Sequence, residues 1–353
     1  MVTELNINVD QMIEFLVGLL NTPSPTGYHV EAINYAQQAF EALAIAGTQF
    51  TITRKGSLLI RLPGLAADAP IALTAHVDTL GFMVKEIKSS GRLALTSLGG
   101  ILWPAVESEG VTIRTHEDRR IRGSIVAENT SVHVNNKIAT TERKADTMEV
   151  RLDEITRSSQ DTRDLGIQVG DFVFVDPRVE VSDSGFIRSR FLDDKASVAC
   201  IYGALLAIKE AGLRLPQDVY ILIANYEEVG HGGAADFPAD LIELLAVDMG
   251  AIGKGQSGDE YSVSICVKDA GGPYHLEMNN KLRRLAEAHD IPHNVDIYVN
   301  YASDGTSYWG AGGSARVGLT GPGVDGSHAY ERTHKDSLQH TAHLLARYML
   351  DEG

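Results

Sequence analysis

The sequence has few cysteines and no long hydrophobic run. Its two cysteines, Cys200 and Cys266, lie in apolar surroundings, which predicts reduced core thiols and excludes a cysteine-rich zinc site. The first 20 residues, MVTELNINVDQMIEFLVGLL, carry early acids and no basic cluster, and their longest apolar stretch is Phe15–Leu20. Neither a secretory signal nor a membrane span is expected, so the default expectation is a cytoplasmic location.

Basic residues are also in deficit. The chain has 31 lysines and arginines against 47 aspartates and glutamates, a net charge of −16. Nucleic acids and anionic membranes are therefore poor candidates for partners. A cluster of metal-binding carboxylates would add to the acid count, but 47 acids exceed the needs of any one site, so most of them must be solvated.

The order of patterns along the 353 residues predicts an α/β fold with an insertion. Helical periodicity at Ala196–Ala211 is followed by a near-continuous apolar run at Val219–Ala224, which is typical of a strand buried on both faces. Between residues 86 and 177, short β-rich pieces alternate with polar turns. We therefore expect a discontinuous catalytic domain of residues 1–85 and 178–353 around an inserted small β-domain.

Two adjacent acids follow that apolar run, in the segment ILIANYEEVGHGGAADF. Glu227 and Glu228 stand where the buried strand ends and before a group of glycines. Neighbouring carboxylates at such a place repel each other and lose hydration, so a positive group is expected beside them. A solvated surface loop is the alternative interpretation.

Other metal-binding residue types occur in four further segments, three of them at an apolar strand end or a helix start. Each has an ordinary alternative: His-x-Asp is a common tripeptide, and two acids at a helix start can act as an N-cap. Together the segments indicate one site, because the ends of strands in α/β sheets converge. The candidates are His76 and Asp78, Asp193 and Asp194, Asp248, and His328 or His334.

Oxygen and imidazole ligands without thiolate suit Zn(II), Co(II) or Mn(II). One bridging carboxylate with two ligands on each side would hold two divalent ions, about 3.5–4 Å apart, that activate a water and polarise a carbonyl. A further carboxylate beside them would serve as the general base. The two glutamates can thus divide these roles, one binding metal and one accepting the proton.

Taken together, the motifs resemble the TET-type aminopeptidases, the family of glutamyl, leucyl and deblocking aminopeptidases in metallopeptidase clan MH. The matching segments keep the family's order over nearly the whole length: NTPSPTGY, AHVDTLGFMV, SLGG, LGIQVGDFVFVDP, LDDKASVA, NYEEVGHGGAA, AVDMG and SDGTS. The resemblance implies a mixed central sheet between helices, like that of other zinc peptidases. It also implies a β-barrel-like insertion that supports homo-oligomers, built from dimers and reaching dodecamers, and short peptides as substrates.

The resemblance also implies roles for individual residues. Glu227 is the general base, and Asp78 is the acidic partner that orients His76. The implied metal ligands are His76 and Asp248 for one ion, Glu228 and His334 for the other, and Asp193 as the bridge. In the loop SDGTS, Asp304 and Thr306 are the implied substrate-binding residues, with Asp304 near the substrate's amino group; a plain turn is the alternative.

The sequence departs from the family pattern in three places. Thr79 stands where an acid usually follows His-x-Asp, and His231 opens a His-Gly-Gly segment where Leu-Arg-Gly is common. The final motif is ERTHKDSL, and His328 competes with His334 for the last ligand position. The segment TGPGVDGSHAYERTH resembles a sub-branch associated with osmolyte gene clusters.

Two other functions remain open on these residues. An N-acyl-amino-acid or amide hydrolase, or a carboxypeptidase, could use the same metal ligands on another substrate. An inactive peptidase-like binding scaffold would be consistent with Thr79 and with the altered final motif. A requirement for a free α-amine separates the first alternative from an aminopeptidase, and metal analysis tests the second.

Overall fold

The computed structural model describes residues 5–352 of the chain. The chain divides into two compact units, one made of the residues up to Asp78 together with those from Val179 onward, and the other of Thr79–Arg178. The predicted class is confirmed: the larger unit is a mixed α/β structure, and the smaller one contains a closed barrel.

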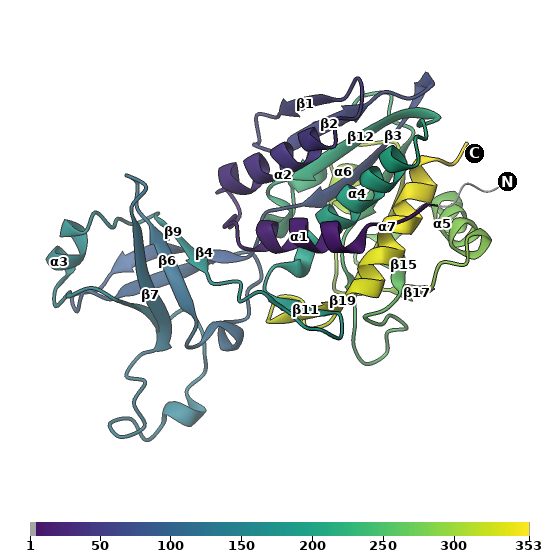
Figure 1. Ribbon diagram of the computed structural model, residues 1–353. Coiled ribbons are helices and arrows are strands. Elements are labelled where there is room, and N and C mark those ends of the chain that lie inside the picture. The colour runs from purple at the N-terminus through teal and green to yellow at the C-terminus, as the bar shows by residue number, and fades with distance from the viewer. Residues whose placement is uncertain (1–4, 353) are drawn as a thin grey trace. The chain divides into compact units, whose positions relative to one another are not determined.

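The larger unit is built on a mixed sheet of ten strands (Figure 1). Its central strands β12, β3, β13 and β18 are parallel, and antiparallel strands flank them on both sides. Strand β14 (Gly250–Ala251) pairs with β18, and β17 (His293–Ile297) pairs with β15. The main order is β1 (Gln49–Ile52), β2 (Leu58–Leu62), β12 (Gln217–Ala224), β3 (Ala66–His76), β13 (Glu243–Val247), β18 (Arg316–Val324), β15 (Val263–Asp269) and β16 (Gly272–Pro273).

Helices cover this sheet. Helix α4 is buried along almost its whole length, because it packs against α1, α7 and β3 at the same time. This explains why its apolar residues are not confined to one face. Cys200 of α4 and Cys266 of β15 are free, buried thiols, as predicted. The helices are α1 (Val9–Leu20), α2 (Val30–Ala42), α4 (Leu192–Glu210), α5 (Leu276–Ala288), α6 (Asp304–Gly310) and α7 (Lys335–Met349).

A second, three-stranded sheet in the larger unit leads directly into α7. Its strands are β10 (Glu180–Val181), β11 (Phe186–Ser189) and β19 (Glu331–His334), in that order and antiparallel. β19 follows the turn that leaves β18, so this sheet fixes the chain immediately beyond a central strand of the main sheet.

Among its described residues, the smaller unit is a six-stranded closed barrel with one short α-helix, α3 (Ser159–Asp164), and two 3₁₀ helices, Trp103–Val106 and Ile138–Thr140. Alternate strand residues such as Phe82, Val84, Val111 and Ile113 are buried inside it, as expected for a barrel small enough to be filled by side chains. Around the barrel the strands are β4 (Gly81–Ile87), β5 (Leu93–Leu98), β8 (Met148–Leu152), β7 (Arg120–Ala127), β6 (Gly110–Arg114) and β9 (Phe172–Val175).

In the part of the chain that the structure describes, no helix has the length and hydropathy needed to cross a lipid bilayer.

Candidate active site

The candidate residues gather at the carboxyl edge of the four parallel strands. Parallel strands end at one edge of a sheet, and the loops beyond that edge commonly form sites. His76 ends β3, Glu227 and Glu228 form a short turn after β12, and Asp248 follows β13. The loop after β18 carries His328, and the first turn of α4 carries Asp193.

One group of potential metal ligands consists of His76, Asp193 and Asp248. One ligand atom from each lies within 4.8 Å of the others, and all three residues are buried. The His76 Nε2 atom is 3.4 Å from Asp193 Oδ1. This is one imidazole and two carboxylates around one point, a donor set that suits a divalent ion such as zinc.

A second group consists of Asp193, Glu228 and His328, again within 4.8 Å. The Nε2 atom of His328 lies 3.6 Å from Asp193 Oδ2 and 3.6 Å from Glu228 Oε2. Asp193 therefore belongs to both groups and directs a different carboxylate oxygen toward each histidine. A carboxylate in this position has the geometry of a bridge between two ions.

His334 lies outside both groups of potential ligands, whereas His328 belongs to the second group. Its Nε2 is 2.9 Å from the carbonyl oxygen of Ser184, and its Nδ1 accepts the Asp336 N–H at 3.2 Å. Helix α7 begins at Lys335, so His334 is its N-cap and not part of a free loop. Both ring nitrogens thus contact backbone groups, and His328 stands beside Asp193 and Glu228 instead.

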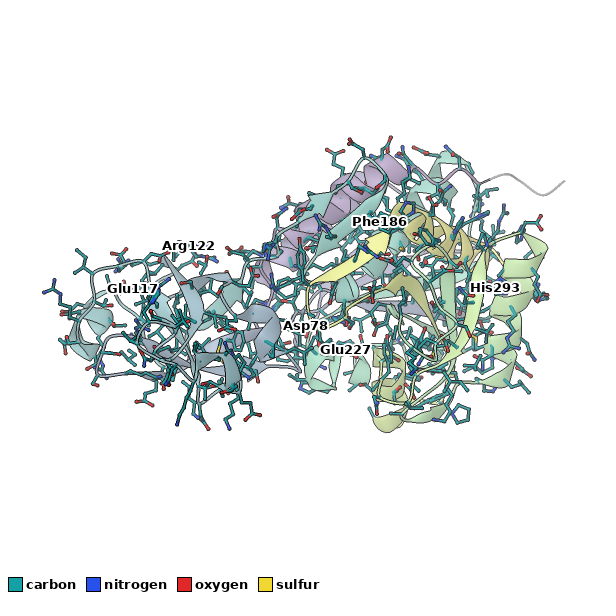
Figure 2. The ribbon with its side chains drawn as sticks, turned by 90° about the horizontal axis from the view of Figure 1, so that it is seen from below. Asp78, Glu117, Arg122, Phe186, Glu227 and His293 are labelled. Atoms are coloured by element: carbon teal, nitrogen blue, oxygen red, sulfur yellow. The ribbon has the colours of Figure 1, made fainter. Side chains whose placement is uncertain are left out.

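Asp78 contacts both His76 and the turn that carries the two glutamates. Its main-chain carbonyl, at 2.8 Å, is the near partner of His76 Nδ1, while its carboxylate is 3.6 Å away. A hydrogen bond from Nδ1 to this carbonyl leaves Nε2 free to bind metal. The Asp78 carboxylate instead accepts the N–H groups of Glu227 at 3.1 Å and Glu228 at 3.3 Å, so Asp78 and Glu227 lie close together in Figure 2.

Burial and like charge make this edge of the sheet unfavourable for so many acids. Burial raises the pKa of Glu227 and of Glu228 well above their ordinary value, and it raises the pKa of Asp248 to about 7. Burial alone would lower the pKa of His76, but its hydrogen bond with Asp193 and the charges of nearby acids raise it well above the usual range. Divalent cations at the two groups would relieve this repulsion, so the residues present fit a metal centre.

Lys195, two residues after Asp193, does not neutralise the acids of the two ligand groups. The Lys195 ammonium donates to the carbonyl oxygens of Leu19 at 3.0 Å and Thr22 at 2.7 Å, at the end of α1. Burial lowers its pKa to about 7. Lys195 thus links the first turn of α4, which carries Asp193, to the end of α1.

Glu227 is close to the first group without belonging to it. Its Oε2 is 3.7 Å from His76 Nε2, and 13% of its side chain is exposed. A carboxylate with a raised pKa and partial exposure, beside a group of potential metal ligands, is a candidate for a general base.

Asp304 and Thr306 lie in the first turn of α6, where their side-chain oxygens bond within the protein. Asp304 is buried and accepts the Gly233 N–H and, at 3.1 Å, the Thr74 hydroxyl. Thr306 donates to the buried carboxylate of Asp269. Gly233 permits this packing, since a Cβ there would lie 2.4 Å from the Asp304 carbonyl oxygen. The role of Asp304 and Thr306 in substrate binding therefore stays a prediction.

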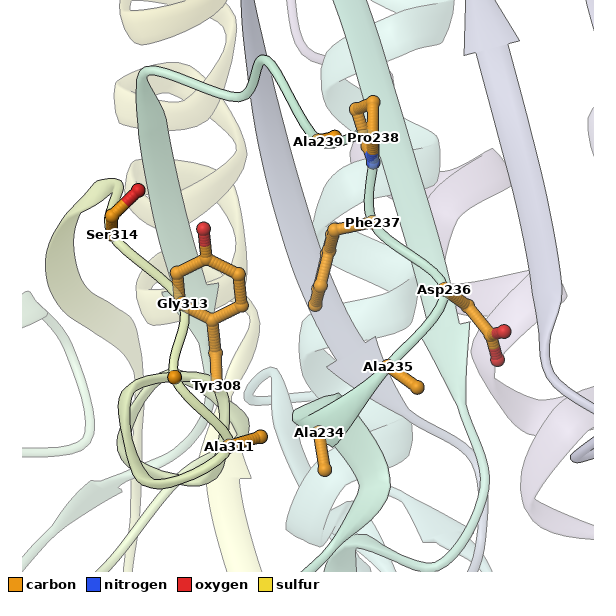
Figure 3. Close-up of a pocket in the computed structure, with 11 residues that line it drawn as sticks. Ala234, Ala235, Asp236, Phe237, Pro238, Ala239, Tyr308, Ala311, Gly313 and Ser314 are labelled. Atoms are coloured by element: carbon orange, nitrogen blue, oxygen red, sulfur yellow. The ribbon is translucent and has the colours of Figure 1, made fainter.

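A pocket of about 260 Å³ opens beside α6 (Figure 3). The rings of Phe237 and Tyr308 meet edge to face across it, with centroids 5.5 Å apart. Its lining contains none of the potential metal ligands described above. The lining residues are Ala234, Ala235, Asp236, Phe237, Pro238, Ala239, Tyr308, Ala311, Gly312, Gly313 and Ser314.

Sequence reasoning missed Glu331, a buried acid at the start of β19. Its carboxylate accepts the backbone N–H groups of Asp193 and His328. Nothing in the segment ERTHKDSL distinguishes this glutamate from a surface residue, because its partners are backbone groups and one of them is more than a hundred positions away.

Comparison with known proteins places the chain in a family. The family model for M42 glutamyl aminopeptidase matches residues 56–344. A putative aminopeptidase of Bacillus subtilis, YhfE, is 47% identical over 342 residues, which cover 97% of this chain and 98% of that protein. A lysyl aminopeptidase of Pyrococcus furiosus is 23% identical over 238 residues, covering 67% of this chain and 66% of the relative.

Solved structures agree on the fold. A TET aminopeptidase from a marine sediment thaumarchaeote superposes with a TM-score of 0.87 at 17% identity, covering 98% of this chain and 97% of that one. A TET peptidase of Pyrococcus horikoshii, described as able to assemble into a tetrahedron or a large octahedral shell, gives 0.82 at 18% identity, covering 96% and 99%. This chain belongs to the M42 glutamyl aminopeptidase family of metallopeptidases, and it is an aminopeptidase.

Proposed function

We propose that this aminopeptidase removes N-terminal residues from short peptides at a centre of two divalent metal ions, with zinc or cobalt preferred and manganese as a third choice. Asp193 carries the proposal, because its Oδ1 lies 3.4 Å from His76 Nε2 and its Oδ2 lies 3.6 Å from His328 Nε2. The residues that would hold the ions are His76, Asp193 and Asp248 on one side, and Asp193, Glu228 and His328 on the other.

The protein's own groups would divide the remaining work. When bound, the ions would polarise the scissile carbonyl and lower the pKa of the attacking water. Glu227 would accept the proton of that water and transfer it to the departing amine. Asp78 would hold Glu227 and Glu228 through their backbone N–H groups and orient His76 through its carbonyl.

The first turn of α6 would act on the substrate through its shape. Asp304 fixes the segment after Glu227 and Glu228 through Gly233, and Thr306 fixes the same helix to Asp269. Asp304 and Thr306 would keep these hydrogen bonds during catalysis, because the first turn of α6 as a whole would border the space for the substrate's free amino group.

The test is peptidase activity after metal removal and replacement. Metal-stripped protein is supplied with Zn(II), Co(II) or Mn(II) and assayed on aminoacyl-anilides that differ only in the first residue, with the N-acetylated compounds as matched controls. We expect metal-dependent release from the free-amine series and none from the acetylated one. Equal cleavage of both series would contradict the proposal and favour an acyl or amide hydrolase.

We also propose that the chain forms homo-oligomers through surfaces that include the barrel unit. The Pyrococcus horikoshii TET peptidase assembles into large shells. Large apolar side chains are exposed on the barrel unit of this chain, among them Val132, Val134 and Ile155, at 66%, 72% and 88%. Light scattering at micromolar concentration should give a mass that is a multiple of 38.2 kDa, and a monomer would refute the proposal.

A further inference from the structure

Glu331 links two segments that both carry proposed metal ligands. It is the first residue of β19 and is only 2% exposed. The Asp193 N–H donates to its Oε2 at 3.0 Å, and the His328 N–H donates to its Oε1 at 3.2 Å. One carboxylate thus joins the first turn of α4 to the loop between β18 and β19.

The loop that Glu331 holds has a restricted backbone. His328 has φ +66°, in the left-handed region that non-glycine residues rarely adopt without support from the surrounding structure. Asp325 and Arg332 close the base of the loop with two backbone hydrogen bonds, and the Ser327 hydroxyl donates to Asp193 Oδ2 at 2.9 Å. Ser327 precedes His328 in the chain and Glu331 follows it. The loop is therefore bonded to Asp193 on both sides of His328.

We propose that Glu331 is a positioning residue for the second metal ion, the one that Asp193, Glu228 and His328 would hold. This inference rests on the proposed two-metal centre and adds a residue that touches neither the ion nor the substrate. Two of the three ligands of that ion have their backbone N–H groups on Glu331, whereas only Asp193 does so in the group with His76 and Asp248. The second site should therefore depend on Glu331 more than the first.

The chemistry of the side chain makes the inference testable by a small change. A carboxylate offers an acceptor oxygen to each of the two N–H groups, while glutamine offers one oxygen and turns an NH₂ group toward the other donor. Glu331→Gln keeps the volume of the side chain and breaks one of the two bonds. Changes in groups that orient metal ligands typically weaken metal affinity about 10–100-fold.

The experiment is calorimetric titration of metal-free protein with Co(II), together with the visible absorption spectrum of bound Co(II), which reports the coordination of each ion. The matched control is Glu243→Gln, because Glu243 is also a buried acid of the larger unit but pairs with Lys281 and Arg316, each at 3.0 Å. In Glu331→Gln we expect the second Co(II) to bind about 10–100-fold more weakly, with an altered spectrum, and the first to change much less. The control should bind both ions as the wild type does.

Three results would overturn the inference. Wild-type affinity for both ions in Glu331→Gln would remove the positioning role, and so would equal weakening in Glu331→Gln and Glu243→Gln, which would indicate general destabilisation. A wild-type chain that binds fewer than two ions would refute the two-metal centre itself, and this inference with it. If Glu331→Gln does not fold, as judged by circular dichroism, Glu331→Asp serves in its place, because its shorter carboxylate reaches only one of the two N–H groups.

Discussion

Glu227→Gln should retain both metal ions and lose about 10²–10⁴-fold in kcat. The glutamine has the same shape and still presents its backbone N–H to Asp78, but it cannot accept the proton of the attacking water. Metal content by mass spectrometry and kcat on a preferred aminoacyl-anilide are the two measurements. Because Glu227 is close to the ligands without being one of them, metal content should stay at the wild-type value.

The matched comparison is Glu228→Gln, one residue along the same turn. Glu228 is among the potential ligands of the second ion, so this variant should lose metal as well as activity. If Glu227→Gln turned over near the wild-type rate, Glu227 would not be the base. If it lost an ion while Glu228→Gln kept both, the roles of the two glutamates would be reversed.

His328→Ala should reduce the metal content from two ions per chain to one and abolish most of the activity. The variant removes the only imidazole of the second group, leaving Asp193 and Glu228 as its ligands. Metal content after dialysis against a weak chelator measures the loss directly, and activity at saturating metal shows whether excess ions compensate for it.

His334→Ala is the paired variant, with a different expected result. It should keep both ions and instead destabilise the fold by about 0.5–2 kcal/mol, because it removes the side chain that caps α7. Thermal unfolding measures this cost. Loss of an ion in His334→Ala, with both retained in His328→Ala, would return the last ligand position to His334.

The parts of the site that follow from the sheet could be predicted from the sequence. Val219–Ala224 is an uninterrupted apolar run, and the polar residues directly after it had to lie at a strand end. The same reasoning applied to the residues before His76 and Asp248. Three parallel strands then brought these residues to one edge, and that follows from sheet geometry without knowledge of individual side-chain contacts.

The choice between His328 and His334 depended on details that periodicity does not contain. Helix α7 begins at Lys335, so His334 is its N-cap. His328 reaches the acids from a left-handed backbone conformation, which nothing in its neighbours Ser327 and Ala329 signals. Polar residues at helix starts are ambiguous in this way, because capping and metal binding use the same nitrogen and oxygen atoms.

Buried hydrogen bonds account for the other residues that sequence reasoning placed incompletely or missed. Asp78 was expected to orient His76, and its carbonyl makes the near contact with that ring, while its carboxylate holds the two glutamates. Glu331 bonds to backbone N–H groups, and these are present at every residue except proline, so no motif marks its partners.

The spread of the proposed ligands along the chain, from His76 on β3 to His328 after β18, has a consequence for the nascent protein. The ribosome makes the strand with His76 first, then the whole barrel unit, and the loop with His328 only much later. A partly synthesised chain that ends before His328 therefore lacks one of the proposed ligands. The proposed centre can be complete only after the segments on both sides of the barrel unit have been made and have folded into one unit.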